Sequence, residues 1–233
     1  MNNNLPSWLQ RHINIFDNEQ IHHAFIISGS KGIGKSLLIE NLAEKILNNK
    51  ISLENNPDFH NLKILAEKKL IGISQIHELR DKLYESSFLG KNKVAVINEI
   101  EKISIDGLNA ILKILEEPPK NTYFLLSTNF LNQIPLTIQS RCFDLRISSP
   151  EIKQSLEWLS GYQTKDALKA LEITNNLPIK AKHFLDNNLL DARDNFVKDV
   201  SGIIKEGKDI ISISENWIDD NDTLNLKLEW MSQ

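Results

Sequence analysis

Residues 1–149 alternate between short apolar runs and longer segments in which apolar residues recur every three or four positions. The runs have the length of buried strands, and they occupy residues 25–28, 94–97, 123–127 and 143–147, with a weaker one at 62–66. Between the runs, Leu38, Leu42 and Ile46 illustrate the helical spacing. Strands that alternate with helices predict an α/β fold with a parallel sheet flanked by helices.

Local signals predict where individual helices begin and end. Ser74 and Ser104 are of a helix-capping residue type, and they predict helices that run to about Tyr84 and to the Pro118-Pro119 pair. The segment 48–58 is polar and contains a proline, which predicts a loop.

After Pro150 the strand pattern gives way to helical spacing. Helix starts are predicted near Ser149-Pro150, at Thr164 and at Leu177-Pro178, while residues 210–213 are compatible with either a helix or a strand. The chain therefore divides into an α/β domain at 1–149, a small helical domain at 150–205 and a further helical segment at 206–233.

The composition is ordinary for a globular protein, with 41% hydrophobic and 25% charged residues. The net charge is −4, and the 11 acidic and 5 basic residues from Asp186 onward disfavour a broad DNA-binding face there. No stretch approaches the ~20 apolar residues of a membrane span, and the N-terminus does not resemble a secretory signal. Cys142 is the single cysteine, so we expect no disulfide, no cysteine zinc site and a cytoplasmic location.

A glycine-rich turn between the first strand and the first long helix carries the strongest chemical signal. It fits the pattern G-x-x-x-x-G-K-[ST] in full, with the residues Gly29, Ser30, Lys31, Gly32, Ile33, Gly34, Lys35 and Ser36. Glycines let backbone N–H groups wrap a phosphate chain, and the helix N-terminus favours the anion. If ATP is bound, we expect Lys35 to reach its outer phosphates and Ser36 to help hold Mg²⁺, whereas Lys31 suits a solvent-exposed position. A chance turn is the alternative reading, and the pattern leaves open whether nucleotide is bound or hydrolysed.

The strand at 94–97 ends in Asn98 and Glu99. P-loop ATPases usually place an acid that orders Mg²⁺ at this point, often followed by a glutamate that polarises the attacking water. Asn98 can hydrogen-bond a metal-bound water but supplies no charge, while Glu99 is either a general base or a surface acid. We therefore predict that hydrolysis by this chain alone is weak or absent.

Two further segments complete the pattern. Residues 109–119 form an amphipathic helix with a proline stop, and residues 135–142 end in Ser-Arg-Cys. Arg141 at the end of a short helix can project from the surface, where its guanidinium suits a phosphate on another molecule. Taken alone, an arginine is more often solvated or salt-bridged.

Together these segments resemble the delta-prime subunits of the bacterial DNA polymerase III clamp loader, within the AAA+ group of P-loop ATPases. The resemblance runs in family order through residues 22–36, 56–62, 88–99, 108–128 and 136–142. It implies that Arg141 acts as an arginine finger at a neighbouring subunit's ATP site and that Thr128 is a sensor residue. It also implies a hetero-oligomer with the tau/gamma and delta subunits, which acts on the sliding clamp and primed DNA, with no membrane partner.

In the same family the helical domain is a lid, and 206–233 would be the start of a truncated or reduced collar. The chain departs from the family pattern in several respects. It lacks the cysteines of a zinc module, carries Asn98 in place of an acid and Ile179 in place of a sensor arginine, and stops at Gln233 near where the collar would begin. The intact P-loop keeps nucleotide binding open.

Three functions remain compatible with these features. The favoured one is a largely structural clamp loader subunit that supplies Arg141. A tau/gamma-like ATPase motor is supported by Glu99 and the full P-loop, but Asn98 and the missing sensor arginine oppose it. An unrelated P-loop enzyme, such as a small-molecule kinase, is opposed by the Ser-Arg-Cys and Glu-Glu-Pro-Pro segments.

Overall fold

A computed structural model of the 233-residue chain describes residues 5–14, 22–89, 91–207, 209–218, 226–228 and 230–231. Five strands form one sheet in the order β2-β3-β4-β1-β5, and every neighbouring pair is parallel. They are β1 (Ala24–Ser28), β2 (Phe59–Leu62), β3 (Lys93–Ile97), β4 (Thr122–Thr128) and β5 (Phe143–Arg146). The predicted α/β fold is confirmed.

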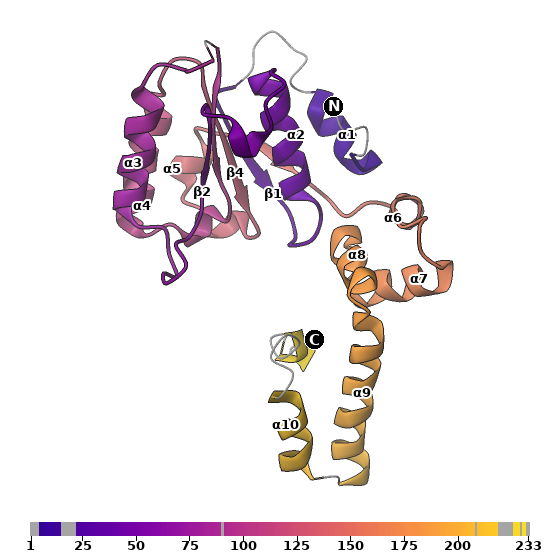
Figure 1. Ribbon diagram of the computed structural model, residues 1–233. Coiled ribbons are helices and arrows are strands. Elements are labelled where there is room, and N and C mark those ends of the chain that lie inside the picture. The colour runs from indigo at the N-terminus through magenta and orange to yellow at the C-terminus, as the bar shows by residue number, and fades with distance from the viewer. Residues whose placement is uncertain are drawn as a thin grey trace.

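Helices cover both faces of the sheet (Figure 1). One face carries α1 (Ser7–Ile13) and α2 (Lys35–Leu47), and the other carries α3 (Ile73–Tyr84), α4 (Ile105–Glu116) and α5 (Leu136–Gln139). Because side chains alternate along a strand, Phe25 and Ile27 pack with α2, while Ala24 and Ile26 pack with α3 and α4. Strands buried on both faces account for the continuous apolar runs in the sequence.

Two predicted boundaries were wrong. Strand β2 occupies Phe59–Leu62 instead of 62–66, because Phe59 pairs with Val94 at the start of the β3 ladder. Helix α3 begins at Ile73 after Gly72, not with Ser74 as its cap, and the Gln75 side chain accepts the Gly72 N–H at 3.3 Å. The Ser104 cap of α4 is confirmed, since its hydroxyl accepts the Gly107 N–H at 3.2 Å.

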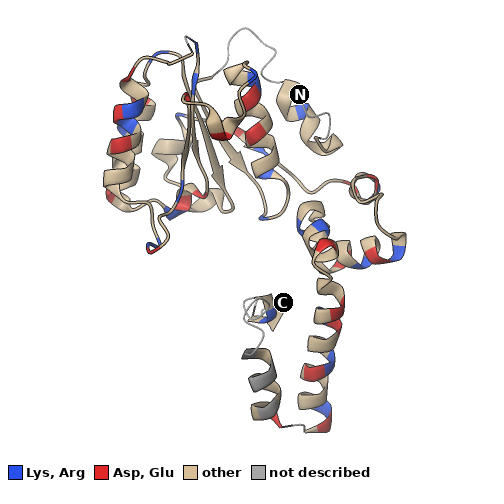
Figure 2. Cartoon of the chain, in the orientation of Figure 1, with Lys and Arg blue, Asp and Glu red and all other residues tan. Residues whose placement is uncertain are grey.

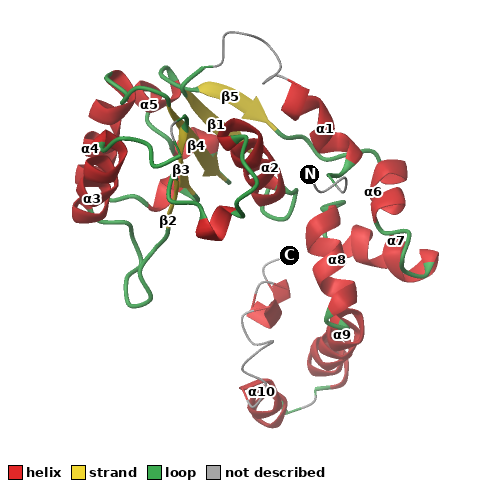
Figure 3. Cartoon of the chain, turned by 45° about the horizontal axis from the view of Figure 1, so that its top comes forward, coloured by secondary structure: helices red, strands yellow, loops and turns green. Residues whose placement is uncertain are grey.

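The second part of the described chain is helical (Figure 3). It contains α6 (Ile152–Trp158), α7 (Thr164–Ile173), α8 (Pro178–Asp186), α9 (Leu189–Glu206) and α10 (Ile210–Ile218). The predicted starts at Thr164 and Pro178 are confirmed, α6 begins two residues after Pro150, and residues 210–213 are helical. The domain limits at 149 and 205 stay predictions, and part of 206–233 lies outside the described residues.

Two small apolar clusters hold these helices together. In the first cluster, Ala170 of α7 and Ala181 of α8 are fully buried. In the second, Phe196 of α9 packs on Trp217 and Trp230. Acidic and basic residues are interspersed along the length of α9 (Figure 2). In the described part of the chain, none of the helices is long and apolar enough to cross a membrane.

Candidate functional site

The loop between β1 and α2 has the backbone that a phosphate loop requires. Gly32 and Gly34 adopt φ values of +91° and +110°, which residues with a side chain rarely adopt. A Cβ at Gly32 would lie 2.7 Å from the Cβ of Lys180, and one at Gly34 would lie 3.0 Å from a Leu9 methyl group. Both positions therefore need glycine for conformation, and Gly32 needs it for space as well.

Lys35 is folded back onto its own loop. Its ammonium donates hydrogen bonds to Gly29 O at 2.7 Å, Ser30 O at 3.1 Å and Asn129 Oδ1 at 2.7 Å. Only 9% of the residue's surface is exposed. Burial lowers the pKa of Lys35 to about 8, against the opposing effect of nearby carboxylates. A phosphate would have to replace some of these three acceptors.

Asn129, directly after β4, is the centre of the polar cluster beside Lys35. Its side-chain amide donates to Glu99 Oε1 at 3.1 Å and to Glu101 Oε1 at 3.2 Å, while its backbone N–H also donates to Glu101 at 3.0 Å. Sequence reasoning missed both Asn129 and Glu101. Thr128, the expected sensor residue, is buried, and its hydroxyl accepts the Phe130 N–H at 3.0 Å. The polar side chain that reaches Lys35 from β4 is therefore that of Asn129.

The residues expected to serve metal and water are engaged by neighbours. Asn98 accepts a hydrogen bond from the Ser127 hydroxyl at 3.2 Å. Glu99 pairs with Lys102 at 2.6 Å through Oε2, and its Oε1 accepts from Asn129. The hydrogen bond from Lys102 is the main reason that the pKa of Glu99 lies below its ordinary value. Glu99 is thus ionised, but both of its oxygens are occupied.

The helical part and α1 both close against the phosphate loop. Gly32 O accepts the backbone N–H groups of Ile179 at 3.2 Å and Lys180 at 3.3 Å, which open α8. On the other side, the Trp8 indole donates to Ile33 O at 3.0 Å. These bonds tie the loop to two elements that the sequence motif does not include.

The loop residues nevertheless suit a triphosphate. The glycine backbone, the N-terminus of the 13-residue helix α2 and the Lys35 ammonium are the donors that phosphate oxygens accept. Ser36 is exposed at the start of that helix, as is Lys31 within the loop. The parts for binding phosphate are therefore present, while Asn98 brings no charge to a metal ion.

Arg141 follows α5 and is held by residues of its own surface. Its Nη2 donates to Glu116 Oε1 at 2.6 Å, and its Nη1 donates to Thr137 O at 2.7 Å and Ser140 Oγ at 3.3 Å. The side chain remains 35% exposed. Arg141 thus forms a salt bridge with Glu116 and is still accessible from solvent.

Strand register places Arg141 far from its own phosphate loop. Phe143, two residues later, pairs with Phe25 near the start of β1, whereas the loop follows Ser28 at the end of β1. The strands are parallel and rise ~3.3 Å per residue, so the length of β5 separates the two sites by roughly 13 Å or more. Arg141 and Lys35 therefore lie at opposite ends of the sheet.

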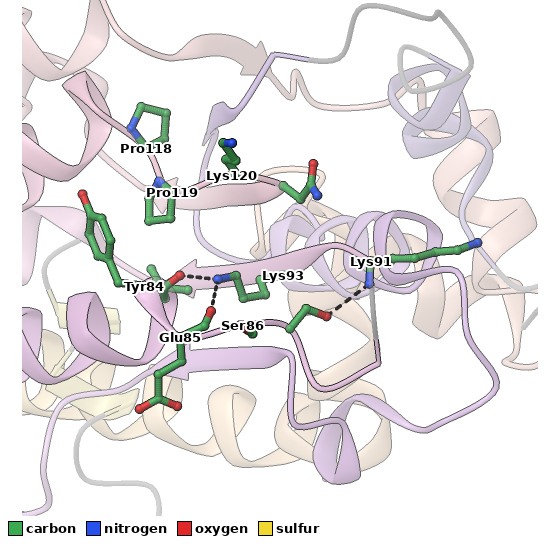
Figure 4. A pocket seen from close by; sticks show the side chains of 11 residues that line it. Tyr84, Glu85, Ser86, Lys91, Lys93, Pro118, Pro119 and Lys120 are labelled. Carbon is green, nitrogen blue, oxygen red and sulfur yellow. Dashed lines mark hydrogen bonds between the residues drawn. The ribbon is translucent and has the colours of Figure 1, made fainter.

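A cavity of about 580 Å³ lies where β3 and β4 begin (Figure 4). This is the end of the sheet at which β5 also begins, just after Arg141. Its walls come from the end of α3, the start of β3 and the Pro118-Pro119 turn. Lys93 lines it, and its ammonium donates to the carbonyl oxygens of Leu83 and Glu85. The cavity is thus remote from the phosphate loop, and no motif in the sequence predicted it.

The sheet order, the phosphate loop and the helical part behind them define a P-loop protein of the AAA+ class. A family model described as "DNA polymerase III, delta subunit" matches residues 5–151, which is more than half of the chain. The chain belongs to that family.

Known proteins with similar sequences are subunits of the same polymerase. DNA polymerase III subunit delta' of Buchnera aphidicola subsp. Schizaphis graminum is 32% identical over 220 residues, which cover 86% of this chain and 66% of the relative. Subunit delta' of Haemophilus influenzae is 30% identical over 78% of the chain and 61% of the relative. A gamma subunit from the first organism is 35% identical over 76% of the chain and 56% of the relative. The chain thus spans less than two thirds of each relative's length.

Solved structures support the fold. A DNA polymerase III gamma subunit-related protein of Thermotoga maritima aligns with a TM-score of 0.53 and 23% identity, over 72% of this chain and 58% of that one. A RuvB variant of the same organism aligns with a TM-score of 0.54 and 15% identity, over 80% of this chain and 61% of that one. At these identities the likeness concerns the fold.

Proposed function

We propose that this chain acts as a delta-prime-type subunit of a DNA polymerase III clamp loader and supplies Arg141 to the ATP site of a neighbouring subunit. The observation that carries the proposal is the separation of Arg141 from its own phosphate loop along the length of β5. A half-exposed guanidinium in that position can contact a triphosphate only if another molecule brings it. Arginine fingers of this kind neutralise the charge that develops on transferred phosphoryl groups.

The chain's own site is better suited to holding a nucleotide than to hydrolysing one. When bound, ATP with Mg²⁺ would occupy the Gly29–Ser36 loop, with Lys35 and Ser36 as its contacts. Asn98 lacks the charge that orders the metal ion, and Glu99 is engaged by Lys102 and Asn129. Closure of α8 on Gly32 adds a further cost to nucleotide entry. Hydrolysis by the isolated chain is accordingly weak or absent, and no zinc takes part.

The partners follow from the kinds of protein that the chain resembles. Its relatives carry the names delta' and gamma, and the proposed partners are the tau/gamma and delta subunits in one cytoplasmic hetero-oligomer. The sliding clamp and primed DNA are reached through that complex. Residues 206–233 would belong to a helical collar through which such subunits contact one another.

A second function is a gamma-like ATPase motor. The gamma relative with 35% identity and the complete phosphate loop favour it. In this case the chain's own loop, and not Arg141, would limit the rate of the complex.

The two functions are separated by reconstituting the chain with tau/gamma and delta subunits and measuring DNA-stimulated ATP hydrolysis. If the chain supplies Arg141, Arg141→Ala lowers the rate of the complex and Lys35→Ala changes it little. A motor predicts the reverse order of severity. Arg80→Ala is the matched control, because Arg80 is another exposed arginine with a carboxylate partner. Failure of the chain to join the complex would contradict both functions.

A further inference from the structure

Arg141 is held in one orientation by two groups from different elements. Glu116 is the last residue of α4, and its carboxylate accepts from Nη2 at 2.6 Å. The Thr137 carbonyl, within α5, accepts from Nη1 at 2.7 Å. Thr137 is only 4 residues from the arginine in sequence, but Glu116 is 25 residues away, so the fold brings the carboxylate to this arginine.

The constraint matters because arginine has many rotamers. An exposed, unrestrained guanidinium loses much conformational freedom when it must meet a phosphate in one geometry. The carboxylate and carbonyl remove part of that freedom in advance. The side chain stays 35% exposed in this position, so the restraint does not bury it.

The restrained guanidinium still has donors to offer. A guanidinium carries five N–H groups, and the contacts with Glu116, Thr137 and Ser140 engage Nη1 and Nη2. Within the described residues, none of its hydrogen bonds involves Nε. The side of the guanidinium that carries the Nε–H, its Nε edge, therefore keeps a donor for a phosphate oxygen.

We propose that Glu116 is a positioning residue for Arg141: it orients the guanidinium so that the Nε edge faces the neighbouring subunit's triphosphate. This inference rests on the proposed function, because it concerns how the same arginine is presented. Glu116 itself touches no nucleotide. Its effect on hydrolysis passes through Arg141 alone.

The test compares variants in the fully assembled complex, with kcat and KM for ATP measured separately. Glu116→Ala is expected to lower kcat by about threefold to tenfold, since small misplacements of a catalytic group slow reactions strongly. KM is expected to change little, because the neighbouring subunit's own loop binds the ATP. Glu116→Gln keeps an acceptor oxygen and is expected to recover kcat to within about twofold of the wild type. Glu117→Ala is the matched control, because Glu117 is the adjacent exposed glutamate.

A double variant separates this inference from the proposed function. Arg141→Ala with Glu116→Ala is expected to match Arg141→Ala alone, and any further loss would show that Glu116 acts elsewhere and overturn the inference. If Arg141→Ala slows hydrolysis but Glu116→Ala equals the wild type, the inference fails and the proposed function stands. If Arg141→Ala has no effect, both fail. Melting temperatures of the variants check that each chain is folded.

Discussion

The buried ammonium of Lys35 should leave a measurable signature in the pH dependence of stability. Burial lowers its pKa from an ordinary value of 10.5 to about 8 in the folded chain. At pH values between about 8 and 10.5, the Lys35 side chain keeps its proton in the unfolded chain but has released it in the folded chain. The unfolded state then binds more protons, so the free energy of unfolding rises with pH in this window. Below about pH 8 both states are protonated and this contribution is constant.

The size of the effect follows from the shift. Each unit of pKa difference corresponds to about 1.4 kcal/mol. The folded chain releases the proton above about pH 8, whereas the unfolded chain still holds it at pH 9.5. The roughly 1.5 pH units between these values therefore raise the free energy of unfolding by about 2 kcal/mol. Lys35→Met removes the titrating group, so the variant should lack this increase. Its free energy of unfolding at pH 7 also reflects the loss of three hydrogen bonds, and only the change with pH is diagnostic.

The assay is urea unfolding, followed by circular dichroism at several pH values, of the wild type, Lys35→Met and Lys31→Met. Lys31 is the matched control because it is an exposed lysine in the same loop. The difference between wild type and Lys35→Met should change by about 2 kcal/mol across the window. Lys31→Met should keep most of the wild-type change, because the charge of Lys31 is the smallest of the influences on the pKa of Lys35. Parallel curves for wild type and Lys35→Met, within about 0.5 kcal/mol, would refute the placement of this ammonium.

Three further predictions concern single positions. Gly32→Ala should lower the free energy of unfolding by about 1–3 kcal/mol in urea titrations, because of its φ of +91° and the closeness of Lys180; Gly161→Ala, with nothing within 4 Å, should be neutral. Asp58→Asn should cost about 1–3 kcal/mol by the same assay, since the buried carboxylate accepts three hydrogen bonds of 2.9 Å from residues 87–89. Burial raises the pKa of the Cys142 thiol to about 12, so its alkylation at pH 8, followed by mass spectrometry, should be at least about 100-fold slower in the folded chain than in urea.

The sequence predicted the parts of the fold that rest on local pattern. The phosphate loop was predictable because glycine at residues 32 and 34 is needed for the backbone itself. The strand runs were predictable because both faces of the sheet are buried. The β2 boundary was wrong because its pairing depends on β3, which a local pattern does not contain.

The contacts between residues of the candidate site could not be predicted from local pattern. Contact of Asn129 with Lys35, 94 residues away in sequence, arises only because β4 pairs with β1. Docking of Ile179 and Lys180 on Gly32 depends on how the helical part packs on the sheet. Arg141 was predicted to project from the surface. Its hydrogen bond with Glu116 was not predicted, because it joins the 109–119 and 135–142 segments, whose patterns do not indicate that they contact each other.

The proposed role of Arg141 is to act on a nucleotide held by another subunit. The most direct measurement is single-turnover ATP hydrolysis by the complete complex, assembled with the wild-type chain or with Arg141→Ala. We expect the ATP site bordering this chain to react at least about 100-fold more slowly with Arg141→Ala, while the other sites keep their rates. Identical time courses for the two complexes would contradict it.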